Sequence, residues 1–222
     1  AAWIDDDPKN AEVLFPYLNG EDLNSRSDCS PSRWVVDFNT RPQSQAMNFR
    51  NPYTRLLRRV RSERAIRDKV ENPEKWWQFK RRSPAMRRAI AGLDEVLVIA
   101  LVSKTVMPVR VPTGQVFSHM LGVFATDSFS DQAVLSSSLH QVWAINYGST
   151  LETRVRYTPS DVFETFPRPE SSEALDAIGR TLDTERREIM LRRGLGLTKL
   201  YNLVNDPGLT GGADPDIDRM RE

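Results

Sequence analysis

The sequence predicts an α+β fold, in which a small twisted β-sheet domain is flanked by helices and followed by a mainly helical C-terminal segment. Three observations predict it. β-Branched apolar stretches separated by turn residues occupy the middle of the chain, from Val96 to Phe124. Apolar residues at helical spacing lie on both sides of that section. A long amphipathic pattern then begins near Ser171, after several prolines, and continues to Leu200.

The N-terminal part is predicted to contain short strands and then basic helices. Val13–Phe15 and Trp34–Val36 are short apolar stretches between turn-rich segments, which is typical of strands joined by loops. Pro52 stands where a helix can begin, because proline is tolerated in the first turn of a helix. Asn72-Pro73 interrupts the helical pattern, and we expect a second helix over residues 76–90.

The central section is predicted to form three strands, over residues 96–102, 106–111 and 116–124. The next helix would be capped by Asp127 or Ser128, since either side chain can accept from the first free backbone amides. The apolar face of that helix would comprise Leu135, Leu139, Val142 and Trp143. A last strand would follow over residues 152–157.

Prolines at positions 159, 167 and 169 mark a domain boundary, since proline neither continues a helix nor donates to a central strand ladder. We therefore expect residues 1–169 to form one domain and residues 170–222 to begin a helical C-terminal region. Ser171 or Ser172 would cap a long helix that breaks near Gly194 and Gly196, and residues 206–218 would form a loose acidic tail. The residues expected on the buried side are Leu175, Ile178, Leu182, Ile189 and Leu200.

Composition restricts the class of protein. With 39% hydrophobic and 27% charged residues, the 222-residue chain is typical of a soluble globular protein, and no apolar run approaches the ~18 residues of a membrane span. The single cysteine, Cys29, excludes an internal disulfide and a cysteine-based zinc cluster, and favours a reducing, cytoplasmic setting. Two histidines are too few for a histidine-rich metal site. Because the chain starts without Met, we expect it to be a piece of a longer protein.

The net charge of +1 hides a strong asymmetry. Residues 1–40 contain eight acidic and three basic residues, whereas residues 50–88 contain fourteen basic and four acidic ones. A basic segment with interspersed aromatic residues is typical of a nucleic-acid-binding surface, and arginine favours phosphate contact. The candidate phosphate ligands are Arg55, Arg58, Arg61, Arg64, Arg81 and Arg82. In an alternative interpretation, these arginines pair with the acidic N-terminal segment. Trp76 and Trp77 could stack on bases, but we expect them to pack the basic helix onto the sheet.

The segment Leu151–Tyr157, which contains the strand expected over residues 152–157, alternates in side-chain character. With a period of two, Glu152, Arg154 and Arg156 would share one face, while Thr153, Val155 and Tyr157 would face a core. Arginine can donate two hydrogen bonds to guanine and glutamate can accept from the cytosine amino group, so the charged face is suited to reading DNA bases. The alternative is a solvated strand whose charges pair with those of a neighbouring strand.

The sequence lacks the common motifs for cofactors and nucleophiles. The sequence contains no glycine-rich cofactor loop after a strand, no P-loop and no Gly-x-Ser-x-Gly elbow. Asn51-Pro52-Tyr53 is similar to the Asn-Pro-Pro-Tyr loop of amino-methyltransferases, but the second proline is absent and we interpret the tripeptide as a helix start. His140 lies beside the apolar helix face and is interpreted as a structural histidine, whereas His119, near a turn, could touch DNA.

Several motifs, in this order, resemble those of one family. The segments are Phe15–Asn24, Arg33–Phe38, Leu135–Ala144, Gly148–Arg154, Tyr157–Asp161, Thr165–Pro169 and Leu197–Asn202. They resemble the target-recognition domain and the start of the C-terminal region of MmeI-like DNA methyltransferases, which are single-chain restriction-modification enzymes with relatives in phage defence. The resemblance covers nearly the whole chain.

The resemblance implies recognition of double-stranded DNA within a parent enzyme that transfers a methyl group from S-adenosylmethionine to adenine N6. It implies no cofactor in this fragment, because the cofactor and Asn-Pro-Pro-Tyr motifs of the family are not in these residues. The fragment would contact the methyltransferase domain of its parent and no membrane. Its base-reading positions would be Glu152, Arg154 and Arg156, with Lys104, Arg110 and Gln115 as looser matches.

Two other classes of function stay open at this point. A protein–protein scaffold would use the basic segment to dock on an acidic partner, and salt-dependent binding to duplex DNA would distinguish the two. A self-contained nuclease would be active by itself with a metal, although no paired carboxylates with a nearby lysine stand out in the sequence.

Overall fold

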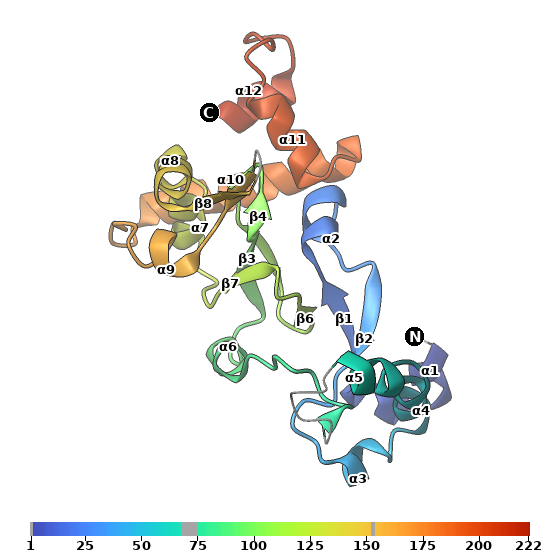
Figure 1. Cartoon of the computed structure of the whole chain (residues 1–222). Helices are drawn as coiled ribbons and strands as arrows, with labels where there is room; N and C mark the ends of the chain where they lie inside the picture. The colour runs from blue at the N-terminus through green and yellow to red at the C-terminus, as the bar shows by residue number, and fades with distance from the viewer. Residues whose placement is uncertain (1, 68–74, 152–153) are drawn as a thin grey trace.

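The structure is a computed structural model that describes residues 2–67, 75–151 and 154–222. Nine strands within these ranges form three sheets of three strands each, and helices lie around them (Figure 1). The predicted α+β class is confirmed. In the described ranges, no helix is both long enough and apolar enough to cross a membrane.

The first sheet has the strand order β2-β1-β6. Strand β1 (Leu14–Leu18) pairs antiparallel with β2 (Arg33–Val36) and parallel with β6 (Val116–Phe117). Both apolar stretches predicted as N-terminal strands are therefore confirmed. The short helices beside this sheet are α1 (Ala2–Asp6), the 3-10 helix η1 (Pro8–Glu12) and α2 (Gly20–Ser25).

The central sheet has the order β5-β3-β7. Strand β3 (Glu95–Ala100) pairs antiparallel with β5 (Val109–Pro112) on one side and with β7 (Leu121–Phe124) on the other. The single strand predicted over residues 116–124 is wrong, because its two ends belong to different sheets as β6 and β7. The amide of Leu121 donates to the carbonyl of Ser118 at 3.0 Å, so the chain turns between them.

The third sheet carries the predicted reading strand. Strand β9 (Arg154–Arg156) lies between β4 (Val102–Ser103) and β8 (Ser149–Leu151), antiparallel to both. The strand predicted over residues 152–157 is confirmed over Arg154–Arg156, while Glu152 and Thr153 lie outside the described residues. The sequence pattern did not predict β8 as a separate strand, whose Leu151 pairs with Arg154 in antiparallel register.

The basic segment is less helical than predicted. Its helices, with the short helix before them, are α3 (Gln43–Ala46), α4 (Arg50–Arg59), α5 (Arg61–Arg67) and α6 (Pro84–Ala89). The helix start around Pro52 is confirmed, but the helix predicted over residues 76–90 begins only at Pro84. Trp76 and Trp77 are instead buried in a cluster with Phe38, Phe49 and Tyr53, and the indole nitrogen of Trp77 donates to the Arg41 carbonyl at 2.9 Å. Burial of the two indole rings therefore overrides helix formation there.

The helix predicted after the central sheet is two helices, α7 (Phe129–Leu135) and α8 (Ser138–Tyr147), followed by α9 (Pro159–Val162). Ser128 caps α7 as predicted, and Ser137 accepts from the His140 amide to cap α8. Because the chain changes direction between α7 and α8, the residues of α8 do not continue the buried face of α7. The apolar face predicted for a single helix is therefore wrong in part. Leu139 is 74% exposed and Val142 is 55% exposed, while His140 is fully buried.

The C-terminal segment is helical, as predicted. It comprises α10 (Glu173–Arg193), α11 (Leu197–Val204) and α12 (Pro215–Arg221). Ser172 caps α10, and Gly194 ends it in the left-handed conformation with φ of 62°. The predicted burial of Ile189 and Leu200 is confirmed, whereas Ile178 is 58% exposed.

The loose tail predicted over residues 206–218 is wrong for its second half. Asp214 accepts from the backbone amides of Asp216 and Ile217 and so caps α12, and Ile217 is buried. The guanidinium of Arg221 binds the carbonyls of Val204 and Leu209 at 2.8 and 2.7 Å. These contacts hold α12 against the end of α11.

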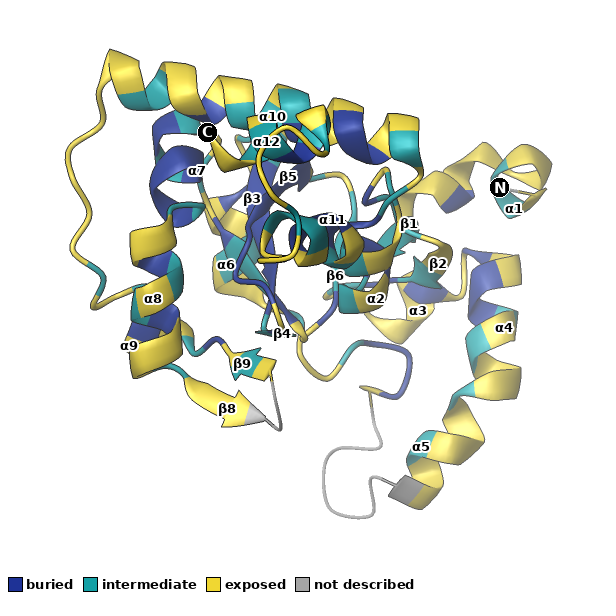
Figure 2. Ribbon diagram, turned by 90° about the horizontal axis from the view of Figure 1, so that it is seen from above, coloured by how far each residue is buried: buried dark blue, intermediate teal, exposed yellow. Residues whose placement is uncertain are grey.

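The core joins the sheet to the C-terminal helices. One cluster of buried residues contains Val96, Val98 and Leu121 of the central sheet together with Ile189 of α10 and Leu200 of α11. Figure 2 shows α10 along one edge of the molecule, with its buried residues turned towards the sheet and its exposed residues turned outward. The helical segment therefore completes the core that supports the central sheet.

The packing of α10 on α7 depends on Gly179. A β-carbon at this position would overlap the backbone carbonyl of Phe129, so only glycine allows this approach. We predict that Gly179→Ala lowers the free energy of unfolding by about 1–3 kcal/mol, although alanine favours the helix itself by ~1 kcal/mol. Urea unfolding measures the change. Gly92→Ala is the matched control, because its β-carbon would meet no atom within 4 Å, and a similar loss in both variants would contradict the prediction.

Candidate nucleic-acid interface

The first candidate surface is the outer face of β9. Arg154 and Arg156 are exposed and alternate with half-buried Val155, as the period of a strand requires. Glu152, the third predicted base-reading residue, lies outside the described residues. Lys104, which follows β4 directly, is also exposed. The structure therefore brings at least two arginines together on one strand, with a lysine beside the neighbouring strand.

Buried contacts fix the position of β9 from behind. The amide of Tyr157 donates to the Leu101 carbonyl at 2.8 Å, and its hydroxyl lies 3.0 Å from Nε2 of His140. Nδ1 of His140 lies 2.7 Å from the Leu135 carbonyl, which can only accept. The hydrogen of His140 is therefore on Nδ1, and Nε2 accepts from Tyr157. The structural role predicted for His140 is confirmed.

Protonation of these two side chains follows from their burial. Burial lowers the pKa of His140, and its hydrogen bond with the Leu135 carbonyl only partly opposes this effect. Burial also raises the pKa of Tyr157, against a smaller opposite effect of Arg168. Both side chains are therefore neutral at physiological pH, which suits a contact that acts as a fixed anchor.

Arg110 is not on the surface, and its predicted base-reading role does not fit its position. Only 4% of the residue is exposed. Its guanidinium donates to the Asp127 carbonyl at 2.8 Å and to Oε1 of Gln132 at 3.3 Å, and it lies 3.9 Å from the ring of Phe129. Strand alternation places Arg110 on a face that α7 covers, which the sequence pattern alone does not show.

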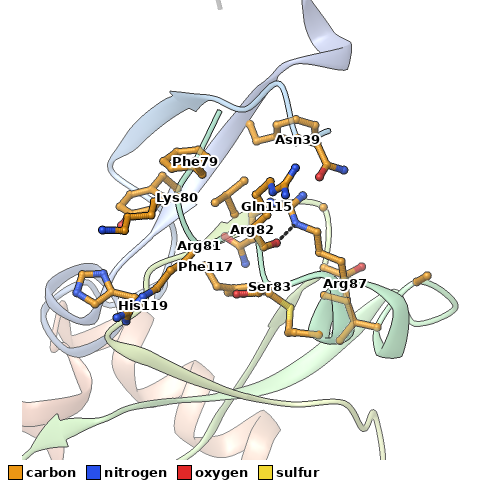
Figure 3. A pocket seen from close by; sticks show the side chains of 18 of the residues that line it. Asn39, Phe79, Lys80, Arg81, Arg82, Ser83, Arg87, Gln115, Phe117 and His119 are labelled. Atoms are coloured by element: carbon orange, nitrogen blue, oxygen red, sulfur yellow. Dashed lines mark hydrogen bonds between the residues drawn. The ribbon is translucent and has the colours of Figure 1, made fainter. Parts of the chain in front are cut away.

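The second candidate surface is a basic cavity of about 830 Å³, shown in Figure 3. It lies between the first sheet and α6, and the turn before β6 also contributes to it. Four of the site residues predicted from the sequence line it: Arg64, Arg81 and Arg82 as phosphate ligands and Gln115 as a looser base-reading match. Further side chains that line it are Phe15, Tyr17, Asn39, Phe79, Lys80, Arg87, Phe117 and His119. None of its lining residues in the described ranges is Asp or Glu, so the cavity favours an anion.

One buried carboxylate organises the wall of the basic cavity. Asp37 is 1% exposed and accepts from Arg87 at 2.5 Å and from the Asn39 amide at 2.8 Å. Arg87 also donates to the Arg82 carbonyl at 2.9 Å. Asn39 and Ser83 adopt positive φ angles of 48° and 47°, which are uncommon for residues other than glycine. Asp37 thus holds both unusual turns in place.

The arginines of α4 and α5 have different surroundings. Arg55 and Arg58 are exposed and line a separate cavity together with Asp6 and Asp7 of the acidic N-terminal segment. This position supports the alternative in which the basic segment faces the acidic N-terminal segment. Arginines nevertheless outnumber carboxylates in this cavity, because Arg50 and Arg59 also line it. The guanidinium of Arg61 lies 5.8 Å from the Trp76 ring. Arg64 is half-buried and donates to the carbonyls of Trp76 and Gln78, so part of its capacity is structural.

Sequence reasoning missed part of the basic cavity. Phe79, Lys80 and Arg87 were within the basic segment, but no individual role was assigned to them. No sequence pattern indicates a binding role for Asn39, since only the tertiary structure brings it into the same cavity as Phe79 and Lys80. His119, predicted as a possible DNA contact, does line the basic cavity.

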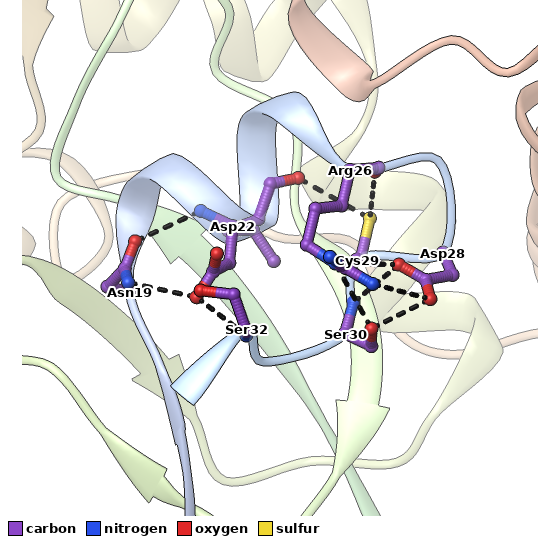
Figure 4. Close-up of polar contacts among 8 residues, drawn as sticks. Asn19, Asp22, Arg26, Asp28, Cys29, Ser30 and Ser32 are labelled. Carbon is purple, nitrogen blue, oxygen red and sulfur yellow. Dashed lines mark hydrogen bonds and ion pairs between the residues drawn. The ribbon is translucent and has the colours of Figure 1, made fainter. Parts of the chain in front are cut away.

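A polar cluster around Cys29 is structural rather than a binding site (Figure 4). Asp22 is buried, and Oδ2 accepts from the Asn19 side chain at 2.9 Å and from the Ser32 amide at 3.1 Å. Burial raises the pKa of the Cys29 thiol to about 11, and its sulfur donates to the Leu23 carbonyl at 3.4 Å. Within the described ranges, no group of His, Cys, Asp and Glu side chains could hold a metal ion.

Exposed arginines on an anchored strand and a basic, aromatic-lined cavity are together typical of a nucleic-acid-binding domain. The family model for the MmeI target recognition domain matches residues 1–170, and the chain belongs to this family. A target recognition domain is the part of a restriction-modification enzyme that recognises the DNA sequence.

The fold is also found in a solved structure, described as the Type IIL restriction-modification enzyme MmeI in complex with DNA. The TM-score is 0.63 at 19% sequence identity, and the match covers 99% of this chain but only 29% of that chain. The chain therefore spans less than a third of that enzyme. No curated protein matches the sequence.

The neutral state of His140 generates a prediction. Since the fold lowers its pKa, its contribution to stability is complete above the unfolded value of about 6.5 and is lost as the pH falls from there through the folded pKa. We predict that the free energy of unfolding falls by up to about 1 kcal/mol between pH 7.5 and 6.0. Urea unfolding at the two pH values measures it.

The only other histidine provides the control for this measurement. His119→Gln should retain the pH dependence of the unmodified chain, whereas His140→Gln should lose it. A His140 ring that takes up a proton by pH 6.0, seen in imidazole nitrogen NMR spectra, would contradict the assignment.

Proposed function

We propose that this chain selects the DNA sequence at which a parent enzyme methylates adenine N6, in a restriction-modification or phage-defence system. Membership of the MmeI target recognition domain family supports the proposal. The observation that carries it is the exposed pair Arg154 and Arg156 on β9, anchored from behind by Tyr157 and His140. A strand held this way can present its side chains to base edges without adjusting its backbone.

Base reading is assigned to β9 and its surroundings. Arg154 and Arg156 each fit the O6 and N7 atoms of guanine, and the side chains of alternate strand residues are about 6.6 Å apart, which corresponds to about two base-pair steps of ~3.4 Å. Glu152 would accept from a cytosine amino group, and Lys104 extends the same positive surface. Gln115 stays a looser match, and Arg110 is left out because it is buried.

Phosphate contact is assigned to the basic segment. Arg55, Arg58 and Arg61 are exposed on α4 and α5, and Arg81 and Arg82 line the basic cavity. Arg64 also lines this cavity and adds positive charge, while its side chain is held by a hydrogen bond to the Trp76 carbonyl. In Figure 2, β8 and β9 project from one end of an edge of the molecule and α5 from the other end of the same edge. This arrangement favours a duplex that lies along that edge. Phosphate contacts would fix its register and leave sequence choice to β9.

The chemistry belongs to other parts of the parent. We propose that S-adenosylmethionine binds in the methyltransferase domain of the parent, that this domain is a partner of the present chain, and that the enzyme acts on DNA in the cytoplasm. We further propose that recognition is centred on residues 1–169 and that residues 170–222 begin the helical region behind it. The family match over residues 1–170 supports this division, while the shared core of sheet and helices indicates that the two parts are packed together.

Phosphate contact predicts a steep dependence of duplex affinity on salt. The logarithm of the affinity should fall linearly with the logarithm of salt concentration, with a slope of ~0.9 per phosphate contacted. The triple variant Arg55→Gln, Arg58→Gln, Arg61→Gln should bind all sequences more weakly and show a slope smaller by up to about 2.7. Fluorescence anisotropy with a labelled duplex at several salt concentrations measures both.

The matched control removes the same charge from α10 and α12, by Arg187→Gln, Arg192→Gln and Arg219→Gln, all of which are well exposed. It should leave the slope unchanged. A salt-independent affinity in the unmodified chain would contradict the phosphate contacts and favour a protein scaffold.

Base reading predicts a changed target sequence when charges are exchanged. In the intact parent, Glu152→Lys with Arg154→Asp swaps donor for acceptor and leaves Val155 and Tyr157 in place. We expect methylation at an altered motif, because each bidentate contact contributes about 1–3 kcal/mol of discrimination between bases. Sequencing of methylated sites before and after the exchange measures it. The control exchange Glu188→Lys with Arg187→Asp, on α10, should leave the motif unchanged. An unaltered motif with a lower rate in the Glu152→Lys, Arg154→Asp variant would exclude base reading by these two residues.

A further inference from the structure

We propose that the basic cavity holds one nucleotide of the DNA that has left the base stack, and that this nucleotide is not the target adenine. The inference rests on the proposed function, because it assumes a bound duplex. The target adenine must reach the methyl donor outside this chain, so a nucleotide held here is a different one. Three features of the cavity support a complete nucleotide rather than a phosphate alone.

The first feature is its size together with its aromatic lining. A volume of about 830 Å³ lies in the range of sites that enclose small ligands. Four aromatic residues line it, namely Phe15, Tyr17, Phe79 and Phe117, and all four are half-buried, with Phe117 also packed against the main core cluster. Phosphate contact needs no aromatic rings, whereas an unstacked base is stabilised by them.

The second feature is the distribution of charge. Arg81 and Lys80 are exposed at the cavity, Arg82 is half-buried, and no carboxylate of the described chain lines it. Arg87 is already paired with Asp37, so its role is to shape the wall. The amide side chains of Asn39 and Gln115 line the same space and can both donate and accept (Figure 3). A phosphate on the arginines and a base edge at the amides would use both kinds of group.

The third feature is that contacts within the chain fix the cavity wall. Asn39 and Ser83 both line the cavity in left-handed conformations, and the Asp37–Arg87 pair fixes the turns that contain them. Uncommon backbone conformations that surrounding contacts enforce are concentrated at ligand sites. Extraction of a base costs unstacking energy, and a rigid, charged, aromatic pocket offsets part of that cost.

The test compares two labelled duplexes, one fully paired and one with a single unpaired nucleotide. Since the unpaired nucleotide has already left the stack, the unmodified chain should bind the second duplex about tenfold more tightly. Phe79→Ala should remove this preference and leave affinity for the paired duplex within about twofold. Phe79→Tyr should keep the preference, because tyrosine offers the same ring for stacking. Tyr147→Ala, on α8, is the control for loss of a half-exposed aromatic ring outside the cavity.

A second variant guards against loss of folding. Gly114 lines the cavity, and a β-carbon there would meet no atom within 4 Å, so Gly114→Phe adds volume without removing a contact. It should also abolish the preference, and circular dichroism checks that both variants are folded. Equal, salt-dependent binding of the two duplexes by the unmodified chain would overturn this inference alone. Absence of salt-dependent duplex binding would overturn the proposed function as well. A preference for the unpaired nucleotide that survives in folded Phe79→Ala or in folded Gly114→Phe would also overturn the inference about the cavity.

Discussion

The close contact between α7 and α10 is the constraint on which the rest of the structure depends. Gly179 removes the side chain that would keep the two helices apart, and a buried polar chain crosses the contact. Gln132 of α7 accepts from Arg110 of the central sheet and donates to Asp183 of α10 at 2.8 Å. Each of these polar groups would be costly to bury alone, so they are stable only when sheet and helices are assembled together.

This contact also determines where the candidate reading strand lies. Helix α8 follows α7 directly and is capped by Ser137. His140 on α8 accepts a hydrogen bond from the hydroxyl of Tyr157, which comes directly after β9. The position of Arg154 and Arg156 therefore follows from the orientation of α7, which α10 sets from the other side. The helical segment after residue 170 thus supports the proposed interface through α7 and α8.

Sequence patterns were sufficient for some parts of this arrangement and not for others. Alternation identified Arg154 and Arg156 as surface residues and Tyr157 as buried, because a strand period depends only on local geometry. It did not predict β8 as a separate strand. The burial of Arg110 and of Trp76 depends on which elements cover them, and the basic cavity combines residues from positions 15 to 119, so neither followed from local patterns.

The state of Cys29 has a practical consequence for measuring motion in solution. It is the only thiol of the chain, it is 7% exposed, and its pKa of about 11 keeps it protonated and unreactive at neutral pH. A cysteine introduced on the surface of β8 and another on α5 would therefore be the only positions to take a thiol-specific spin label. Distances between two such labels would report whether the hairpin and the basic helix approach each other when a duplex binds.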